Sequence, residues 1–217
     1  PFIQHCKESV WKYKGMWEDF SATVGFWADM DDPYVTYDDN FIESEWWALK
    51  QIWEKGLLYK GFKIVPYCPR CGTPLSSHEV AQGYKDVKER SAIARFKVKG
   101  EEAYILAWTT TPWTLPSNVA LCVNPDEDYI KVKMKDQDYV YYLAAALADT
   151  VLGAETYDVL ETYKGKDLEF KEYEALYPVE LKKKAYYVVC DPYVTMTDGT
   201  GVVHIAPAFG EDDSKVG

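Results

Sequence analysis

The chain has 217 residues, of which 47% are hydrophobic and 16% aromatic, so it can bury a sizeable core as one large or two small domains. Its formal net charge of −11 excludes a broad binding surface for the phosphate backbone of nucleic acid, but not contact with one flexible strand end. Its five cysteines do not form a disulfide framework, nothing resembles a signal peptide, and no apolar run is long enough to cross a membrane. These features predict a reduced, cytoplasmic setting and no membrane partner.

The first part of the chain has the periodicity of helices. An amphipathic stretch from about residue 6 to residue 24 predicts one helix, and the acidic residues 29–39, which include Pro33, predict a loop. A second helix is predicted at residues 40–56. Its boundary signals are Asn40 as N-cap, Glu43 as the acid of a capping box and Gly56 as the C-terminal stop. Its apolar stripe, which predicts packing against a core, consists of Phe41, Ile42, Trp46, Leu49, Ile52 and Trp53.

From residue 61 onward the pattern changes to short strands separated by turn signals. Strands are predicted at residues 63–67, 92–98, 103–109, 119–123, 129–134, 139–143, 186–190 and 201–205. Lys99 and Gly100 predict a tight hairpin, Pro125 a strand end, and Gly199 a turn with positive φ. Many strands joined by short turns, without an internal repeat, predict a β-barrel or a β-sandwich.

Cys68 and Cys71 form a knuckle with the spacing that a tetrahedral zinc accepts from one turn. The pair is only half a site, because no second pair with this spacing occurs. His5 with Cys6, or His78, could contribute ligands only if folding brought them close. The sequence therefore leaves open either a structural zinc or two free thiols.

Residues 108–118 (WTTTPWTLPSN) place four threonine hydroxyls in one short segment with two prolines and two indoles. Threonine is a good strand former, so the run is compatible with a strand whose alternate side chains face solvent. Pro112 and Pro116 favour a ligand site instead, because proline ends strand pairing and leaves backbone groups and hydroxyls available. The residues by themselves leave both interpretations open.

His204 and Asp213 are two further candidate site residues. His204 lies in a strand of small and β-branched residues, a pattern compatible with a hydrogen-bonded core histidine or with a catalytic one. Asp213 ends an acidic trio after a turn, so its carboxylate could enter a pocket and pair with an ammonium group of a ligand. No nucleophile elbow, glycine-rich phosphate loop or His-Glu metalloprotease motif occurs, so any hydrolysis must depend on a positioned water.

Residues 108–118, together with residues 199–213 (GTGVVHIAPAFGEDD), closely resemble the editing domain of isoleucyl-tRNA synthetases. The segments that carry the resemblance are the helix with Trp46 and Trp47 and residues 61–71, 73–84, 108–118 and 199–213. They cover nearly the whole chain in the family order. Related synthetases for valine and leucine carry an arginine after two threonines in the equivalent run. Here Thr111, Pro112 and Trp113 occupy that stretch, which favours the isoleucine family.

The resemblance implies an α+β fold, mainly β, in which an editing-domain β-barrel is preceded by a helical flank from the class I synthetase core. The implied domains are the flank at residues 1–62, a Cys-knuckle connection at residues 63–84 and the editing domain at residues 85–217. Because the sequence starts at Pro1 without an initiator methionine and stops soon after a motif, we expect a piece of a longer protein. The nucleotide-binding signatures of the core are absent, so ATP is expected only in the full-length ligase.

In this family the editing domain hydrolyses the ester of valine wrongly attached to tRNA(Ile). Valine and isoleucine differ by one methylene, worth roughly 1–3 kcal/mol in an apolar pocket, a limit for which isoleucyl-tRNA synthetases are themselves the usual example. By resemblance, Asp213 binds the substrate ammonium, and His204 lies beside the amino-acid side chain and limits the pocket. The residues assigned to catalysis are Thr109, Thr110, Thr111, His204 and Asp213, and those assigned to substrate binding are Thr114 and Asn118.

The implied partners are the 3′ end of tRNA(Ile) carrying valine and the remainder of the synthetase chain, which would hold the tRNA body. No cofactor is expected for the hydrolysis, and a structural zinc at Cys68 and Cys71 is the one metal considered. An alternative is a non-catalytic module that binds a free amino acid or nucleotide. A further alternative is a valine-type enzyme that edits threonine, which Trp113 and its neighbours argue against.

Overall fold

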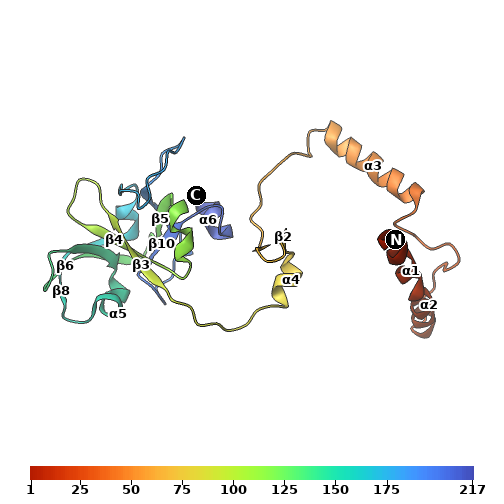
Figure 1. The fold of residues 1–217 in the computed structure, drawn as a ribbon, viewed down its shortest axis with the longest axis horizontal. Helices are drawn as coiled ribbons and strands as arrows, with labels where there is room; N and C mark the ends of the chain where they lie inside the picture. The colour runs from red at the N-terminus through yellow and green to blue at the C-terminus, as the bar shows by residue number, and fades with distance from the viewer. The chain divides into compact units, whose positions relative to one another are not determined.

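The computed structural model describes residues 1–217 and divides into two units, Pro1–Phe62 and Lys63–Gly217. The first unit consists of helices and the second contains the sheet (Figure 1). The helices of the first unit are α1 (Phe2–Lys12), α2 (Lys14–Thr23) and α3 (Asp39–Glu54). The mainly β fold with a preceding helical part is therefore confirmed.

Two details of the helical unit differ from the prediction. The single helix expected at residues 6–24 is two helices that meet at Tyr13. Gly15, a poor helix former, lies two residues further on, in the first turn of α2. Helix α3 is confirmed, but its N-cap is Asp38 instead of Asn40, and no side-chain hydrogen bond caps it. Gly56 follows the helix with φ of 69°, as its predicted role as a stop requires.

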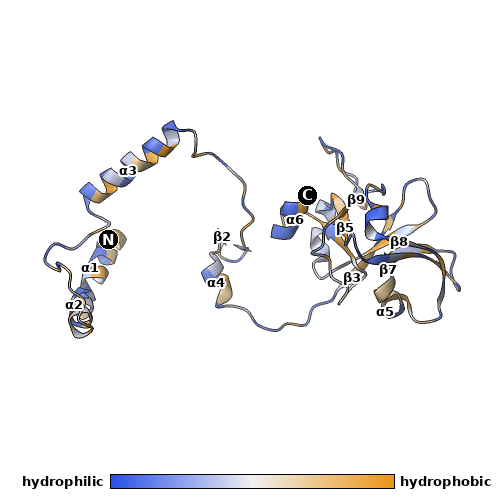
Figure 2. Cartoon of the chain, turned by 180° about the vertical axis from the view of Figure 1, so that it is seen from behind, coloured by the Kyte–Doolittle hydropathy of each residue, from blue (hydrophilic) through white to orange (hydrophobic).

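The apolar stripe of α3 does not pack against a core within this chain. No residue of α1, α2 or α3 is buried, and the side chains of Trp46 and Trp53 are 68% and 65% exposed. Figure 2 shows hydrophobic and hydrophilic residues alternating along α3. An amphipathic helix needs a facing surface, and a unit of 62 residues supplies too little of it.

The second unit begins with the cysteine knuckle. A two-stranded sheet pairs β1 (Tyr67–Cys68) with β2 (Thr73–Pro74), and helix α4 (Ser77–Ala81) follows. The predicted strand at residues 63–67 is wrong except at Tyr67, because its other residues pair with no neighbouring strand. Ser76 and Glu79 form a reciprocal capping box for α4 that the sequence prediction did not include.

The remaining strands form one eight-stranded sheet with the order β8-β6-β7-β4-β10-β5-β9, while β3 pairs with the other edge of β4. These strands are β3 (Ala92–Lys97), β4 (Tyr104–Thr109), β5 (Ala120–Val123), β6 (Asp128–Met134), β7 (Val140–Ala144), β8 (Tyr157–Lys164), β9 (Tyr187–Cys190) and β10 (Val202–Ile205). Seven of them were predicted to within about two residues, and the hairpin turn at Gly100 and the break after Val123 are also confirmed.

The sheet curls, and residues 171–174, which connect β8 to β9, form hydrogen bonds with both β3 and β9, two strands that are not neighbours in the sheet. On one side the carbonyl of Lys171 accepts from Val188 of β9, and Tyr173 donates to Tyr186 just before that strand. On the other side Glu174 donates to Lys97 of β3, and the carbonyl of Glu172 accepts from Lys99 just after it. The enclosed core is aromatic and aliphatic, and its largest fully buried side chains include Phe96, Tyr129 and Leu121. The strands thus surround a main apolar interior, as in a barrel, and two smaller buried clusters form around Leu143 and Ile205.

Strand β8 and the six short helices of the second unit were not predicted. The side chains of β8 are mostly exposed, so the alternation that marks a half-buried strand is absent from its sequence. It pairs with β6 across a bulge at Lys131 and Val132. Besides α4, the short helices are the 3₁₀ helices η1 (Pro112–Ser117), η2 (Ala145–Leu147) and η3 (Gly165–Leu168) and the α-helices α5 (Ala148–Leu152) and α6 (Glu211–Val216).

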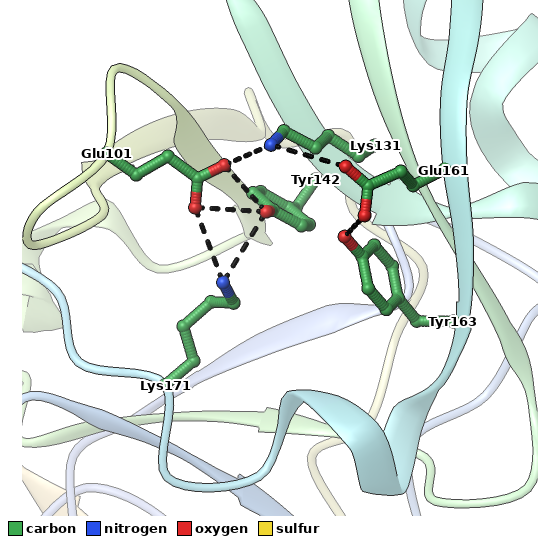
Figure 3. Close-up of polar contacts among 6 residues, drawn as sticks. All are labelled: Glu101, Lys131, Tyr142, Glu161, Tyr163 and Lys171. Carbon is green, nitrogen blue, oxygen red and sulfur yellow. Dashed lines mark hydrogen bonds and ion pairs between the residues drawn. The ribbon is translucent and has the colours of Figure 1, made fainter.

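A polar network braces the turn between β3 and β4 against the neighbouring strands (Figure 3). Its members are Glu101, Lys131, Tyr142, Glu161, Tyr163 and Lys171. The hydroxyl of Tyr142 donates to Glu101 at 2.8 Å, and Lys131 pairs with both Glu101 and Glu161. Burial alone would raise the pKa of Glu101, but the bonds from Lys131 and Tyr142 outweigh it and hold the pKa below its usual range. The network is internally neutralised and lies at the Tyr104 end of β4, away from the threonine run.

Candidate active site

Two parallel strands bring the candidate residues to one edge of the sheet. Strand β10 pairs in parallel with β4, with Val203 opposite Trp108. Parallel strands end at the same edge, so the segments that follow Thr109 and Ile205 both begin there. The threonine run and the segment leading to Asp213 are therefore neighbours, although about a hundred residues separate them.

The threonine run leaves its strand and turns back on itself. Strand β4 ends at Thr109, and Pro112 occupies the first position of η1, where a missing N–H costs no hydrogen bond. The backbone N–H of Thr111 donates to Oγ1 of Thr109 at 3.0 Å, and Oγ1 of Thr114 donates to the carbonyl of Thr111 at 2.8 Å. The hydroxyls of Thr109, Thr111 and Thr114 are thus linked by local bonds at the point where the chain leaves the sheet.

His204 is bonded to the threonine run. Its Nε2 lies 3.0 Å from Oγ1 of Thr114 in a buried contact between residues 90 positions apart. Because the Thr114 hydroxyl hydrogen is used by the carbonyl of Thr111, Nε2 carries the proton and donates. The imidazole is 6% exposed, and its Nδ1 is buried without a partner. Burial lowers the pKa of His204, so the ring is neutral at pH 7.

Asp213 lies in the first turn of α6 and its carboxylate is directed back across the turn before the helix. Its Oδ1 accepts from the backbone N–H of Ala206 at 3.4 Å. Gly210 provides the necessary space, because a Cβ there would come within 2.1 Å of Oδ2 of Asp213. Burial raises the pKa of Asp213, and the bond from Ala206 opposes part of that rise.

These side chains line one cavity of about 210 Å³. Its walls are formed by Trp108, Thr109, Thr110, Thr111, Thr114, Val203, His204, Ala206, Phe209 and Asp213. One wall is polar, with threonine hydroxyls and a carboxylate, and the rest is aromatic or aliphatic. Such a cavity can hold a small ligand that has an apolar branch and a cationic or hydrogen-bonding group.

One predicted site residue lies outside the cavity. Asn118 is buried, donates to the carbonyl of Ala120 at 2.8 Å and accepts from the hydroxyl of Tyr173 at 2.7 Å. Both bonds hold the chain in place between η1 and β5, and the side chain of Asn118 does not line the cavity. Four cavity residues were not among the sequence candidates: Trp108, Val203, Ala206 and Phe209. Only the apolar or aromatic character of residues flanking the motifs could have indicated them.

The cysteine knuckle does not make a complete metal site. The backbone N–H of Cys71 lies 3.3 Å from Sγ of Cys68 and lowers the pKa of that thiol, while Cys68 raises the pKa of Cys71. No group of three or more His, Cys, Asp and Glu side chains able to hold a metal occurs in residues 1–217, and His78 contacts Gln82. Two thiols do not satisfy tetrahedral zinc, so a zinc here would require ligands from outside these residues.

The comparison with known proteins identifies the family. Residues 1–199 match the family described as tRNA synthetases class I (I, L, M and V). The chain belongs to the class I tRNA synthetases. It is 60% identical over 218 aligned residues to the isoleucine–tRNA ligase of Clostridium novyi, which confirms the expected resemblance. All of the chain is covered, but it spans about 21% of the length of that relative.

Solved structures agree with this family at the level of the fold. A crystal structure of GlLeuRS-CP1 has a TM-score of 0.50 and 18% identity to this synthetase chain, with 58% of each chain covered. The cytosolic leucyl-tRNA synthetase editing domain of P. knowlesi has a TM-score of 0.50 and 16% identity, with 61% of this chain and 63% of that one covered. None of the helices is both long and apolar enough to span a lipid bilayer.

Proposed function

We propose that the cavity hydrolyses the ester between valine and tRNA(Ile), as a post-transfer editing site of an isoleucyl-tRNA synthetase. The observation that carries the proposal is the shared cavity, in which the threonine hydroxyls, His204 and Asp213 meet from two distant segments. The sequence similarity to isoleucine–tRNA ligases and the likeness to leucyl-tRNA synthetase editing domains support it.

Substrate selection follows from the two kinds of wall. The carboxylate of Asp213 pairs with the α-ammonium of the aminoacyl group, which anchors the ester carbonyl at a fixed distance from the imidazole. The His204 ring is held by Thr114 and cannot turn away without losing that hydrogen bond. The ring therefore excludes a side chain with one more methylene, and this steric test adds to the weak discrimination available from binding alone.

The hydrolytic step uses a positioned water. Since Nε2 of His204 already donates to Thr114, the imidazole acts mainly through its shape and not as the base. The hydroxyls of Thr110 and Thr111 and nearby backbone N–H groups polarise the ester carbonyl as negative charge develops on its oxygen. Water adds to that carbon, the ester bond breaks, and the leaving ribose oxygen takes up a proton.

An adjacent cavity suits the nucleoside part of the substrate. It has a volume of about 290 Å³ and shares Trp108 and Val203 with the first cavity. Thr195 and Asp198 line it and offer hydrogen-bonding groups of the kind that a ribose and an adenine need. A ligand with two parts, an aminoacyl group and an adenosine, therefore matches the two adjoining cavities.

The partners follow from the same proposal. The 3′ end of the tRNA enters the cavity, while the tRNA body contacts other parts of the synthetase, because the formal charge of this chain is −11. The uncovered apolar faces of α1, α2 and α3 pack against the remainder of the synthetase chain. The ligase reaction and its ATP belong to the full-length enzyme, in the cytoplasm.

The decisive experiment measures release of valine from valyl-tRNA(Ile) by the 217-residue chain, with isoleucyl-tRNA(Ile) as the matched control. We expect valine to be released and isoleucine to be retained. Binding of a non-hydrolysable valyl-adenosine analogue without any hydrolysis of the ester would instead indicate a binding module. A crystal structure with that analogue would locate the ammonium, which must contact Asp213. Faster hydrolysis of threonyl-tRNA than of valyl-tRNA would indicate a valine-type enzyme.

A further inference from the structure

One face of the sheet beside the cavity carries aromatic and cationic side chains that the proposed hydrolysis does not use. We call the group of Arg95, Tyr104, Tyr139 and Tyr141 the tyrosine–arginine patch. Arg95 is on β3, Tyr104 on β4, and Tyr141 on β7, with Tyr139 just before that strand. The strand register places Tyr104 opposite Tyr141, so the three strands present these side chains on one face.

The side chains of the patch pack around Tyr141, which is buried, while Arg95 and Tyr139 are exposed and Tyr104 lies edge-on to Tyr139. The Arg95 guanidinium lies 5.0 Å from the ring centre of Tyr139 and 5.6 Å from that of Tyr104, and it donates to the hydroxyl of Tyr141 at 3.5 Å. The rings of Tyr139 and Tyr141 are stacked with centres 6.0 Å apart and planes 21° apart. A planar cation among aromatic rings presents flat surfaces to which a nucleotide base can add by stacking.

Among the cationic residues in the strands of the large sheet, only Arg95 lacks a carboxylate partner. It is exposed and has no carboxylate partner, although the chain contains 35 acidic residues. The neighbouring cations are neutralised, since Lys97 pairs with Glu102 and Lys133 with Asp138. Arg95 therefore remains available for a phosphate, and its fixed plane suits bidentate contact.

The patch is continuous with the cavity. Ile93 faces Trp108 across the strand pair and Arg95 faces Leu106, so Trp108 and Arg95 share one sheet face. Measured along the strands from Trp108, Arg95 is two residues away and Tyr104 is four residues away. These separations correspond to roughly 7 Å and 13 Å. Ile93, opposite Trp108 on β3, is 45% exposed. A short single strand leaving the cavity past Trp108 would reach the patch.

We propose that the tyrosine–arginine patch binds the unpaired nucleotides that precede the terminal adenosine of the substrate RNA. The bases stack on Tyr139 and Tyr104, and Arg95 contacts a backbone phosphate. This inference rests on the proposed function, since the adjoining cavity must hold the terminal aminoacyl-adenosine. It explains how so acidic a chain can hold one end of an RNA strand.

The test compares two substrates, the valine ester of adenosine and the valine ester of the trinucleotide that ends tRNA, by kcat/KM of hydrolysis. We expect kcat/KM to be about tenfold higher for the trinucleotide ester, which is the effect expected of one stacked base. In Arg95→Ala and in Tyr139→Ala, kcat/KM for the trinucleotide ester should fall to about the value for the adenosine ester. Tyr139→Phe, which keeps the ring, should retain the advantage.

The matched control is Arg90→Ala, which removes the same charge from an exposed residue outside the regular structure and should leave the advantage intact. Equal kcat/KM for the two esters in the unmodified chain, or an undiminished advantage in Arg95→Ala, would overturn the inference. If neither ester is hydrolysed, the proposed function fails. In that case, binding of a labelled trinucleotide to the unmodified, Arg95→Ala and Arg90→Ala chains, measured by fluorescence anisotropy, still tests the patch. The inference requires weaker binding in Arg95→Ala and unchanged binding in Arg90→Ala.

Discussion

The hydroxyl of Thr114 accepts a hydrogen bond from Nε2 of His204 at 3.0 Å, and it passes its own hydrogen to the carbonyl of Thr111. This relationship joins the two segments that line the cavity and orients the imidazole. It also assigns the proton of the neutral ring to Nε2, which leaves Nδ1 without hydrogen. The orientation of His204 therefore depends on a residue of the threonine run.

Replacing Thr114 by valine removes this link at almost constant volume. We expect Thr114→Val to lower the free energy of unfolding by about 1–3 kcal/mol, because the buried His204 then has no hydrogen-bond partner on either nitrogen. Urea denaturation of both proteins measures the change. Thr110→Val, at an exposed position, is the control and should have little effect. Equal stabilities of Thr114→Val and the unmodified chain would contradict the assigned hydrogen bond.

Asp213→Ala should reduce hydrolysis of valyl-tRNA(Ile) by about a hundredfold or more and leave the fold intact, because the ammonium loses its charged partner. Initial rates with mischarged tRNA and circular dichroism give the two readouts. Asp212→Ala removes an exposed carboxylate from the same turn and should retain activity. Unchanged deacylation by Asp213→Ala would eliminate the ammonium role.

His204→Ala should make the cavity accept isoleucine, because the excluding ring is gone. The measured quantity is release of isoleucine from correctly charged tRNA(Ile), which the unmodified chain should not catalyse. We expect the selectivity for valine to fall by roughly 10- to 200-fold, the range associated with one methylene. A variant that still spares isoleucyl-tRNA would show that the ring does not set the size limit.

Gly210→Ala should impair hydrolysis without a large loss of stability. Its φ of −153° is available to alanine, but the added Cβ would come within 2.1 Å of the Asp213 carboxylate, which must move. We expect about a tenfold loss of kcat/KM, as for a slightly misplaced binding group. Gly15→Ala, whose Cβ meets nothing within 4 Å, is the control. Full activity of Gly210→Ala would mean that the carboxylate position is not critical.

Stability should fall on acidification because of His204. Burial lowers its pKa, so the folded chain binds this proton less readily than the unfolded chain. Stability is therefore complete above the unfolded pKa of about 6.5 and is lost as the pH falls below it, by at most about 1.4 kcal/mol per pH unit. Asp213 has the opposite sign, since burial raises its pKa and its contribution declines as the pH rises from about 4.

Urea denaturation between pH 8 and pH 5 in the unmodified chain and in His204→Gln separates the two effects. The glutamine variant lacks the titrating ring but keeps Asp213, so the difference between the two curves belongs to His204. We expect that difference to grow below pH 6.5. Parallel curves over the whole range would argue against a depressed pKa for the imidazole.

The amino-acid sequence by itself determined the kinds of structure that form. Apolar alternation located most strands, because side chains of a half-buried strand must alternate between core and solvent. Glycines such as Gly100, which has a positive φ, marked turns, and the two motifs indicated the threonine run, His204 and Asp213 as candidate site residues. These features are local, and local chemistry is visible in the sequence. Strand β8 escaped prediction because its exposed side chains carry no such alternation.

The tertiary structure alone decided which of these residues meet. The parallel pairing of β10 with β4 places Val203 beside Trp108, and this pairing brings His204 to Thr114 and Asp213 to the same cavity. No local preference encodes a pairing between residues about a hundred positions apart, because it depends on the packing of the whole curled sheet. The same packing turned Asn118 inward to Tyr173, although its place in the motif suggested a position in the cavity wall.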